Sequence, residues 1–367
     1  MKDSEPDLSL FYSEVPAEAS ALFTRSHFPG APIVVGRERM RAGCLQAVVV
    51  NSKVSNVATG EQGLEDARRM ARLAARELGV SEELVLVSAT GVIGRRLPMD
   101  KIEDGLRGIA LELADDPWPA ARGIMTTDTE PKALSIDVGS ATLTAVGKGS
   151  GMIAPNLATM LVYLFTDAKL SAATLKDLLE DATAQSFQCL SVDSDTSTSD
   201  TVALLANGRM GPVDERAFRS ALNRICLRMA EWLARDGEGA TKLLRVQVEG
   251  AATDAEARRV ARAVIDSPLI KTMAFGADPN VGRIIMAVGK CVDCRIVPEK
   301  LSATLQGVAV VEKGLLASFE EAHVRNLLQG DPVEIAIDLG VGEGSGLGLG
   351  CDLTEGYIVE NAAYASS

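Results

Sequence analysis

Two patterns of apolar residues alternate along the chain, one typical of buried strands and one typical of amphipathic helices. Short apolar runs predict strands at 43–51, 83–88, 160–165 and 201–206, the last of them ending at Asn207-Gly208. Apolar residues three and four positions apart predict helices at 64–78, 99–113, 172–187 and 218–233. The segment 135–146 alternates around Gly139-Ser140, which predicts a hairpin. Strands and helices interleaved in this way favour a mixed α/β fold.

A second module is expected to begin at Lys242. It contains a strand, a helix that starts at Thr253-Asp254, and several strands that extend to Ile337, one of them in the apolar-rich run 284–297. No proline-rich or serine-rich linker precedes this module, so we expect a packed boundary rather than a flexible one.

The composition is that of an ordinary globular protein. The chain has 367 residues, enough for two or three domains, and its 37 basic and 50 acidic side chains give a net charge of −13. This acidic balance argues against nucleic acid or an anionic membrane as a partner, since both favour clustered Lys and Arg. No signal-peptide pattern is visible, and the apolar runs are shorter than the ~20 residues of a membrane helix. We therefore expect a cytoplasmic protein with reduced thiols.

The sequence contains no complete metal-binding motif. The chain has two histidines, His27 and His323, which excludes a multi-histidine metal site and disfavours a Ser-His-Asp relay. Cys291 and Cys294 form one CxxC, which supplies half of the ligands that a structural zinc needs. The segment 193–200 lacks the glycine and the glutamate of a calcium loop, and we interpret it as a polar loop before the strand at 201.

The glycine-rich segments do not fit the nucleotide-binding motifs. The glycines from Gly340 to Gly350 stand at even positions, whereas the dinucleotide fingerprint needs one spacing of two and one of three. Lys148 is followed by glycine instead of the Ser or Thr of a Walker A loop. The sequence therefore predicts no nucleotide cofactor.

The segment 148–161, KGSGMIAPNLATML, places a hydroxyl residue where an N-terminal nucleophile would stand. Thr159 directly precedes a strand-like run and follows a polar loop that contains Gly149, Gly151 and Pro155. In such enzymes the threonine hydroxyl attacks the preceding carbonyl, and cleavage between Ala158 and Thr159 frees an α-amine. With an ordinary pKa of about 7.7–8.0, this amine is suited to act as a general base. A threonine that merely caps a strand fits the same residues.

The same segment resembles the processing motif of the ornithine acetyltransferase (glutamate N-acetyltransferase) family. Further motifs of this family follow in its order from residue 50 to residue 366. They are NVATGEQGLEDA (56–67), SATGVIGRRLPM (88–99), IMTTDTEPK (124–132), SVDSDTSTSDT (191–201), DGEGATKL (236–243), GADPNVGRI (276–284) and the ending GCDLTEGYIVENAAYAS.

The resemblance implies a fold, a division of the chain and an assembly. The fold is α/β, a layered α-β-β-α sandwich of the self-processing DmpA/ornithine acetyltransferase type with a smaller C-terminal α/β module. Residues 1–158 become the α fragment, 159–241 begin the β fragment, and 242–367 form the C-terminal module with a substrate-contacting tail. The two fragments associate as a heterodimer that dimerises again.

The resemblance also implies roles for particular residues. Thr159 is the self-cleaving threonine, with the cut after Ala158, and then the acyl-accepting nucleophile. Thr90 and Gly91 line the oxyanion hole. The substrate-contacting positions are Thr126, Lys148, Thr159, Glu238, Asn361 and Ser366. Lys148 would pair with a substrate α-carboxylate and Glu238 with an amino group.

The implied reaction moves acetyl from N2-acetyl-L-ornithine to L-glutamate in arginine biosynthesis, with small amino-acid substrates and no cofactor. Acetyl-CoA stays open as an additional donor. The chain departs from the family at 51–56, where the family often reads NSGNAN, and at 276–282, where it often reads GEDPNWG. These departures spare the nucleophile and the oxyanion pair but bear on substrate shape. Transfer to a different amino acceptor in specialised metabolism, or to water as in aminopeptidase-like relatives, therefore remains an alternative.

Overall fold

The computed structural model describes residues 6–154 and 160–363. The chain divides into two compact units. Unit 1 comprises Met1–Gln188 and Asp195–Met229, and unit 2 comprises Cys189–Ser194 and Ala230–Ser367. Each unit is built on one seven-stranded sheet that contains both parallel and antiparallel pairs.

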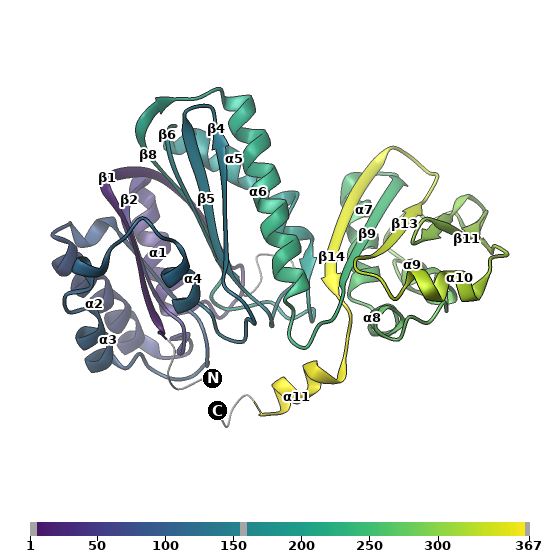
Figure 1. The fold of residues 1–367 in the computed structure, drawn as a ribbon, viewed down its shortest axis with the longest axis horizontal. Coiled ribbons are helices and arrows are strands. Elements are labelled where there is room, and N and C mark those ends of the chain that lie inside the picture. The colour runs from purple at the N-terminus through teal and green to yellow at the C-terminus, as the bar shows by residue number, and fades with distance from the viewer. Residues whose placement is uncertain (1–5, 155–159, 364–367) are drawn as a thin grey trace. The chain divides into compact units, whose positions relative to one another are not determined.

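The sheet of unit 1 has the strand order β3-β2-β1-β8-β6-β5-β4 (Figure 1). Its strands are β1 (Leu8–Phe23), β2 (Cys44–Asn51), β3 (Val85–Ala89), β4 (Lys132–Val138), β5 (Ala141–Lys148), β6 (Leu161–Lys169) and β8 (Thr201–Pro212). β2 and β3 run parallel, as do β6 and β8, and the other neighbours are antiparallel.

β1 changes partner at Glu18. Its first part pairs with β2 and its last part with β8, and the register shifts between Tyr12 and Ala17. Backbone hydrogen bonds from Gly30 to Thr198 (2.8 Å) and from Ala31 to Asn56 (3.0 Å) then connect the segment before β8 to the segment after β2. The carboxyl end of β2 and the amino end of β8 therefore meet at one end of unit 1.

β2 is buried on both faces, which explains its continuous apolar run. Ala47 and Val49 pack in one core cluster with α2 (Gly60–Leu78) and α3 (Met99–Leu106). Val48 and Val50 pack in another cluster, which includes Tyr163 of β6 and residues of α4 (Trp118–Gly123). The remaining helices of this part of the chain are α1 (Ala31–Arg39), α5 (Ala172–Ala184) and α6 (Glu215–Arg235).

The sheet of unit 2 has the order β12-β11-β10-β13-β9-β14-β7. Its strands are β7 (Leu190–Ser191), β9 (Leu243–Ala251), β10 (Ser302–Leu305), β11 (Val308–Glu312), β12 (Leu315–Leu316), β13 (Val333–Asp338) and β14 (Gly344–Cys351). Its helices are α7 (Asp254–Ile265), α8 (Pro268–Phe275), α9 (Gly282–Gly289), α10 (Glu321–Leu327) and α11 (Glu355–Ala363). One apolar core joins residues of α7, α8, α9 and α10 to the strands.

The alternating glycines near the C-terminus have a packing role in β14. A Cβ atom at Gly344 would lie 2.3 Å from the backbone of Thr253, and one at Gly346 would lie 2.5 Å from the backbone of Arg258. These glycines therefore allow α7 to lie directly against the strand, because a side chain on that face would collide with the helix backbone.

Most predicted elements are present. The strands at 43–51, 83–88, 160–165 and 201–206 correspond to β2, β3, β6 and β8, and the hairpin at 135–146 to β4 and β5. The helices at 64–78, 172–187 and 218–233 correspond to α2, α5 and α6, and Thr253 caps α7 by accepting a hydrogen bond from Glu256 N. The α/β fold class is confirmed.

Three predictions from the sequence are wrong, one about the type of an element and two about where an element ends. The run 284–297 is not a strand, because Ile284, Ala287 and Val288 form the buried face of α9. The helix at 99–113 ends at Leu106, since Gly108 adopts a φ of +79° before a separate 3-10 turn. β8 does not end at Asn207-Gly208 but continues to Pro212, with Gly208 at a φ of +74°. The strand β1 was not predicted.

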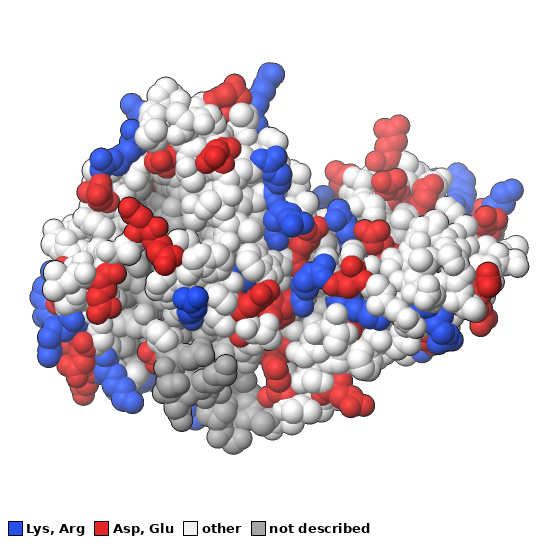
Figure 2. Space-filling view, in the orientation of Figure 1, with Lys and Arg blue, Asp and Glu red and all other residues white. Residues whose placement is uncertain are grey.

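Acidic and basic side chains are interspersed on the visible face of each unit in Figure 2. In the part of the chain that the structure describes, no helix is both long enough and apolar enough to cross a membrane.

Candidate functional site

Thr90 and Gly91, the predicted oxyanion pair, follow directly after β3. Thr90 donates its backbone N–H to the carbonyl of Asn51 at 2.9 Å, and Val92 donates to the carbonyl of Lys53 at 3.1 Å. Gly91 has a φ of +118°, and a Cβ atom there would lie 2.3 Å from the Lys53 carbonyl oxygen. The turn is thus held tightly against the segment that follows β2, and glycine is the residue that fits it.

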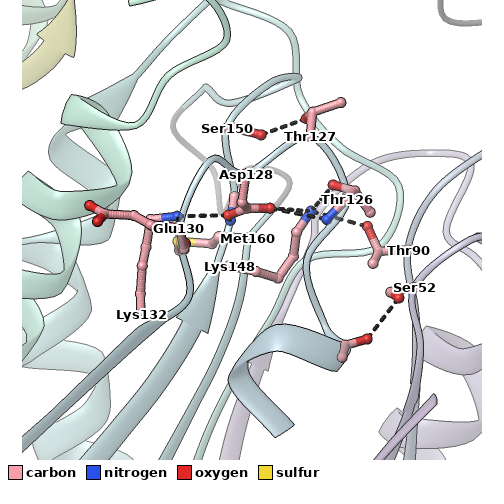
Figure 3. A network of polar contacts seen from close by, with 12 residues as sticks. Ser52, Thr90, Thr126, Thr127, Asp128, Glu130, Lys132, Lys148, Ser150 and Met160 are labelled. Atoms are coloured by element: carbon pink, nitrogen blue, oxygen red, sulfur yellow. Dashed lines mark hydrogen bonds and ion pairs between the residues drawn. The ribbon is translucent and has the colours of Figure 1, made fainter. Parts of the chain in front are cut away.

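Lys148 brings two other predicted site residues together. It ends β5 and is 2 % exposed. Its Nζ donates to Thr126 Oγ1 at 2.8 Å and to Thr90 Oγ1 at 3.5 Å (Figure 3). Lys148 also pairs in register with Leu161, the first residue of β6. The ammonium group and the two hydroxyls therefore meet at the end of the sheet where β6 begins.

A buried aspartate, Asp128, organises this cluster (Figure 3). Its Oδ1 accepts hydrogen bonds from Lys132 Nζ at 2.8 Å and from the Gly149 N–H at 2.7 Å. Its Oδ2 accepts one from the Thr126 N–H at 3.2 Å and lies 4.0 Å from Lys148 Nζ. Asp128 thereby fixes the backbone next to both Thr126 and Lys148.

Asp128 is ionised although it is buried. Burial by itself raises the pKa of this carboxyl, but the charges of Lys148 and Lys132 and the hydrogen bonds from Lys132 and Gly149 hold the pKa below its usual value. The three charged side chains together carry one net positive charge. A buried positive charge beside two hydroxyls is suited to an anionic group such as a carboxylate.

Asp200 is a second buried aspartate at this end of unit 1. It directly precedes β8, and its Oδ1 accepts a hydrogen bond from the backbone N–H of Met160 at 3.1 Å. Burial raises the pKa of Asp200 well above its usual value. The Met160 N–H, the Lys148 charge and side-chain hydrogen bonds with Ser197 and Thr24 offset this only in part. Burial is thus the largest effect on the Asp200 pKa, and it favours the protonated form.

Three of the predicted site residues, Ala158, Thr159 and Ser366, lie outside the described residues. Met160, which a peptide bond joins to Thr159, is described and directly precedes β6.

Glu238 and Asn361 form a separate pair within unit 2. Asn361 Nδ2 donates to Glu238 Oε2 at 2.8 Å and to the carbonyl of Tyr357 at 3.0 Å. The helix α11 that carries Asn361 packs on the turn at Gly239, where a Cβ atom would lie 2.3 Å from Tyr357 N. A carboxylate held by an amide in this way can accept a further hydrogen bond from an ammonium group.

The CxxC cysteines do not form a reactive site. Cys291 and Cys294 are free thiols that follow α9. Burial raises the pKa of Cys291, and it raises that of Cys294 to about 11, so both are protonated at neutral pH. Among residues 6–154 and 160–363, no cluster of His, Cys, Asp and Glu is placed to hold a metal ion.

The sequence pattern did not point to Asp128, Lys132 or Asp200. Each lies within a motif quoted above, Asp128 and Lys132 in IMTTDTEPK and Asp200 in SVDSDTSTSDT. Acidic residues in such polar segments are usually solvated, so their burial could be found only from the fold.

The fold and these clusters define an α/β protein with two mixed sheets and a polar, cationic site where a buried strand begins. A family model described as "ArgJ family" matches residues 1–366. The chain therefore belongs to the ArgJ family, which confirms the family resemblance seen in its motifs.

Relatives of known name cover nearly the whole chain. It is 43% identical over 368 residues to the arginine biosynthesis bifunctional protein ArgJ 2 of Nostoc sp., covering 100% of this chain and 95% of that protein. It is 42% identical over 370 residues to the glutamate N-acetyltransferase Oat2 of Streptomyces clavuligerus, covering 99% and 94%. The solved structure of the arginine biosynthesis bifunctional protein argJ from Bacillus halodurans is similar with a TM-score of 0.53 and 37% identity, covering 56% of this chain and 98% of that one.

Proposed function

We propose that this chain is a self-processing N-acetyltransferase that moves acetyl from N2-acetyl-L-ornithine to L-glutamate in arginine biosynthesis. The observation that carries the proposal is the cluster of Thr90, Thr126 and Lys148 at the end of the sheet where β6 begins. In the sequence, Thr159 stands two residues before the first residue of β6. The relatives named as arginine biosynthesis proteins and as a glutamate N-acetyltransferase support the reaction.

Self-processing creates the nucleophile and its base together. The Thr159 hydroxyl attacks the carbonyl carbon of Ala158, the C–N bond breaks, and the Thr159 nitrogen takes up the hydroxyl proton. Water then hydrolyses the ester, which leaves the carboxylate of Ala158 and a free Thr159. The products are an α fragment of residues 1–158 and a β fragment of residues 159–367, with 242–367 as the C-terminal module.

Acetyl transfer then follows a ping-pong cycle. The Thr159 hydroxyl attacks the acetyl carbonyl of the donor, its α-amine accepts the hydroxyl proton, and ornithine leaves with a proton. The glutamate amine next attacks the acetyl-enzyme and releases Thr159. Thr90 and Gly91 stabilise the oxyanion in both steps, an effect worth roughly 3–4 kcal/mol per donor.

Substrate binding follows from the charges at the two clusters. Lys148 and Thr126 hold the α-carboxylate, supported by the net positive charge of the Asp128 cluster. Glu238 binds an amino group, an assignment that its hydrogen bond from Asn361 supports, and Ser366 is a further substrate-contacting position.

The reaction needs no cofactor or metal, because the donor supplies the acetyl group and the chain supplies the attacking atom. The two fragments remain associated as a heterodimer that dimerises again. We place the enzyme in the cytoplasm, with small amino acids rather than nucleic acid or membrane as its partners.

Intact-mass analysis of the purified protein tests self-processing. The expected result is two fragments of residues 1–158 and 159–367, while Thr159→Ala remains one chain. A wild-type protein that stays uncut would overturn the proposal.

A donor and acceptor panel tests the reaction. N-acetyl-ornithine and acetyl-CoA are supplied as donors to glutamate and to other amino compounds, and free acetate is measured in parallel. Transfer from N-acetyl-ornithine to glutamate is expected to be fastest. Faster transfer to another amine would identify a different acceptor, and release of acetate alone would identify a hydrolase. Thr159→Ala is the control for uncatalysed transfer.

A further inference from the structure

We propose that Lys132 is a positioning residue for binding of the substrate carboxylate. It takes up the charge of Asp128, so that Asp128 does not cancel the charge that Lys148 presents to an anion. The inference rests on the proposed function, because it takes Lys148 as the residue that binds the α-carboxylate.

Lys132 and Lys148 come to Asp128 from two neighbouring strands (Figure 3). Lys132 is the first residue of β4, and Lys148 is the last residue of β5. Lys132 pairs in register with Gly147, which directly precedes Lys148, so the antiparallel pairing brings both lysines to the same end of the sheet. Both are buried, with exposed fractions of 0 % and 2 %.

The carboxylate of Asp128 divides its two oxygens between these lysines. Oδ1 accepts hydrogen bonds from Lys132 Nζ at 2.8 Å and from the Gly149 N–H at 2.7 Å. Oδ2 accepts one from the Thr126 N–H at 3.2 Å and lies 4.0 Å from Lys148 Nζ. A carboxyl group that accepts N–H hydrogen bonds at both oxygens, one of them from an ammonium group, is in its acceptor-only, ionised form. Asp128 is therefore hydrogen-bonded to Lys132, whereas its contact with Lys148 is the longer one.

This arrangement leaves a positive charge on the side of Lys148. Its Nζ donates to Thr126 Oγ1 at 2.8 Å, well inside the 4.0 Å to Asp128 Oδ2. Without Lys132, Asp128 and Lys148 would form a neutral pair, and the pair would attract a carboxylate far less. Lys132 also donates to the carbonyl of Glu130 at 3.2 Å. Glu130 is itself exposed, so solvent screens its carboxylate.

The preference of the site for a negatively charged group can be measured as a ratio of two dissociation constants. Titration calorimetry at pH 7 gives the Kd of L-ornithine, which the proposed reaction releases, and the Kd of L-ornithinamide, which lacks the carboxylate. We define the carboxylate preference as the Kd of ornithinamide divided by that of ornithine. For the wild type we expect a preference of about tenfold or more.

Removing the charges one at a time and together tests the role of Lys132. Lys132→Met lowers the charge of the three side chains from one positive charge to zero, so the carboxylate preference should fall about tenfold. The double variant Asp128→Asn with Lys132→Met restores one positive charge and should keep the preference within about threefold of the wild type. Asp128→Asn alone should not lower the preference. If Lys132 only supported the fold, the double variant would bind no better than Lys132→Met, because it lacks two native side chains.

Two further variants serve as controls. Arg39→Met is the matched control, because Arg39 is also a buried cation of unit 1 but lies on α1 and pairs with Glu83. It should leave the carboxylate preference unchanged, whatever it does to stability. Lys132→Arg keeps the positive charge and should retain more of the preference than Lys132→Met does. Circular dichroism reports whether each variant is folded.

Two results would overturn the inference: Lys132→Met with the wild-type preference, or a double variant with a preference as low as that of Lys132→Met. If Lys132→Met does not fold, the double variant decides, and loss of its preference would overturn the inference. A wild type without a carboxylate preference would overturn the assignment of Lys148 and this inference with it. A wild type that prefers the carboxylate but transfers no acetyl would count against the proposed reaction and not against the role of Lys132.

Discussion

Replacing Asp128 by asparagine tests the buried charge cluster of unit 1. The substitution keeps the shape of the side chain but removes the negative charge that faces Lys132 and Lys148. It also sets an amide donor against one of the N–H groups of Thr126 and Gly149. Removing one partner of a buried ion pair costs about 3–5 kcal/mol. Because the asparagine oxygen can retain one hydrogen bond, we expect the free energy of unfolding to fall by roughly 2–4 kcal/mol.

Urea unfolding at pH 7, followed by circular dichroism, measures this loss. The matched control is Asp104→Asn, because Asp104 pairs with Arg107 at the surface, where the side chains are 73% and 71% exposed. The control should cost less than about 0.5 kcal/mol. Combining Asp128→Asn with Lys132→Met should cost less than the sum of the single changes by about 1–3 kcal/mol. A cost for Asp128→Asn no larger than that of the control would refute the reasoning.

Three further predictions concern backbone strain, pH and thiol reactivity. Gly91→Ala should lower the free energy of unfolding by about 3 kcal/mol or more, because its Cβ atom would collide with the Lys53 carbonyl. Gly94→Ala, with open space around it and a φ of +81°, should lower it by about 1 kcal/mol. Thermal unfolding measures both losses, and equal losses would contradict this prediction. The raised pKa of Asp200 contributes stability that is complete below its unfolded pKa of about 3.9 and is lost as the pH rises toward its folded pKa. The Tm of Asp200→Asn relative to that of the wild type should therefore increase as the pH is raised above about 4. A difference in Tm that does not change with pH would show that Asp200 is ionised. The Cys294 thiol, with a pKa of about 11, should react with iodoacetamide at pH 7.5 far more slowly than free cysteine does. Intact mass measures this rate, and reaction at the rate of free cysteine would contradict the raised pKa.

The elements predicted correctly from the sequence are those in which the buried positions follow a simple pattern. β2 is covered on both faces and α6 has one apolar stripe, so their patterns are unambiguous. β1 escaped prediction because Pro16 and the acidic residues around it argue against a strand. The irregularity between Tyr12 and Ala17 in the pairing of β1 with β2 accommodates the proline, and a local sequence pattern does not show it.

Short apolar runs fail for a different reason. Residues 284–288 are apolar at nearly every position, which suits a buried strand as well as a helix buried in a core. In unit 2 the run became α9, because it packs against α7 and α8 rather than pairing with a strand. Whether such a run forms a strand or a helix depends on tertiary contacts, which a local sequence pattern does not show.

The clusters around the predicted site were predictable only in part. The family motifs named Thr90, Thr126 and Lys148, and the fold brings these three side chains together. The same motifs contain Asp128, but its spacing from Lys132 would equally suit an exposed pair. Asp128 is buried because β5 carries Lys148 and Gly149 to the loop that holds Asp128, which is a long-range consequence of sheet order.

The two buried aspartates show why residue type alone cannot assign chemistry. Asp128 faces two ammonium groups and accepts hydrogen bonds at both oxygens, so its pKa stays low and it remains a charge. Burial raises the pKa of Asp200 well above its usual value, although the Met160 N–H, the Lys148 charge and hydrogen bonds with Ser197 and Thr24 lower it. Asp128 therefore offsets one of the two lysine charges, whereas Asp200 holds the Met160 amide with a carboxyl whose pKa is raised. If the surroundings of Asp128 and Asp200 were exchanged, the directions of their pKa shifts would be exchanged too, although the sequence would still show two aspartates in polar motifs.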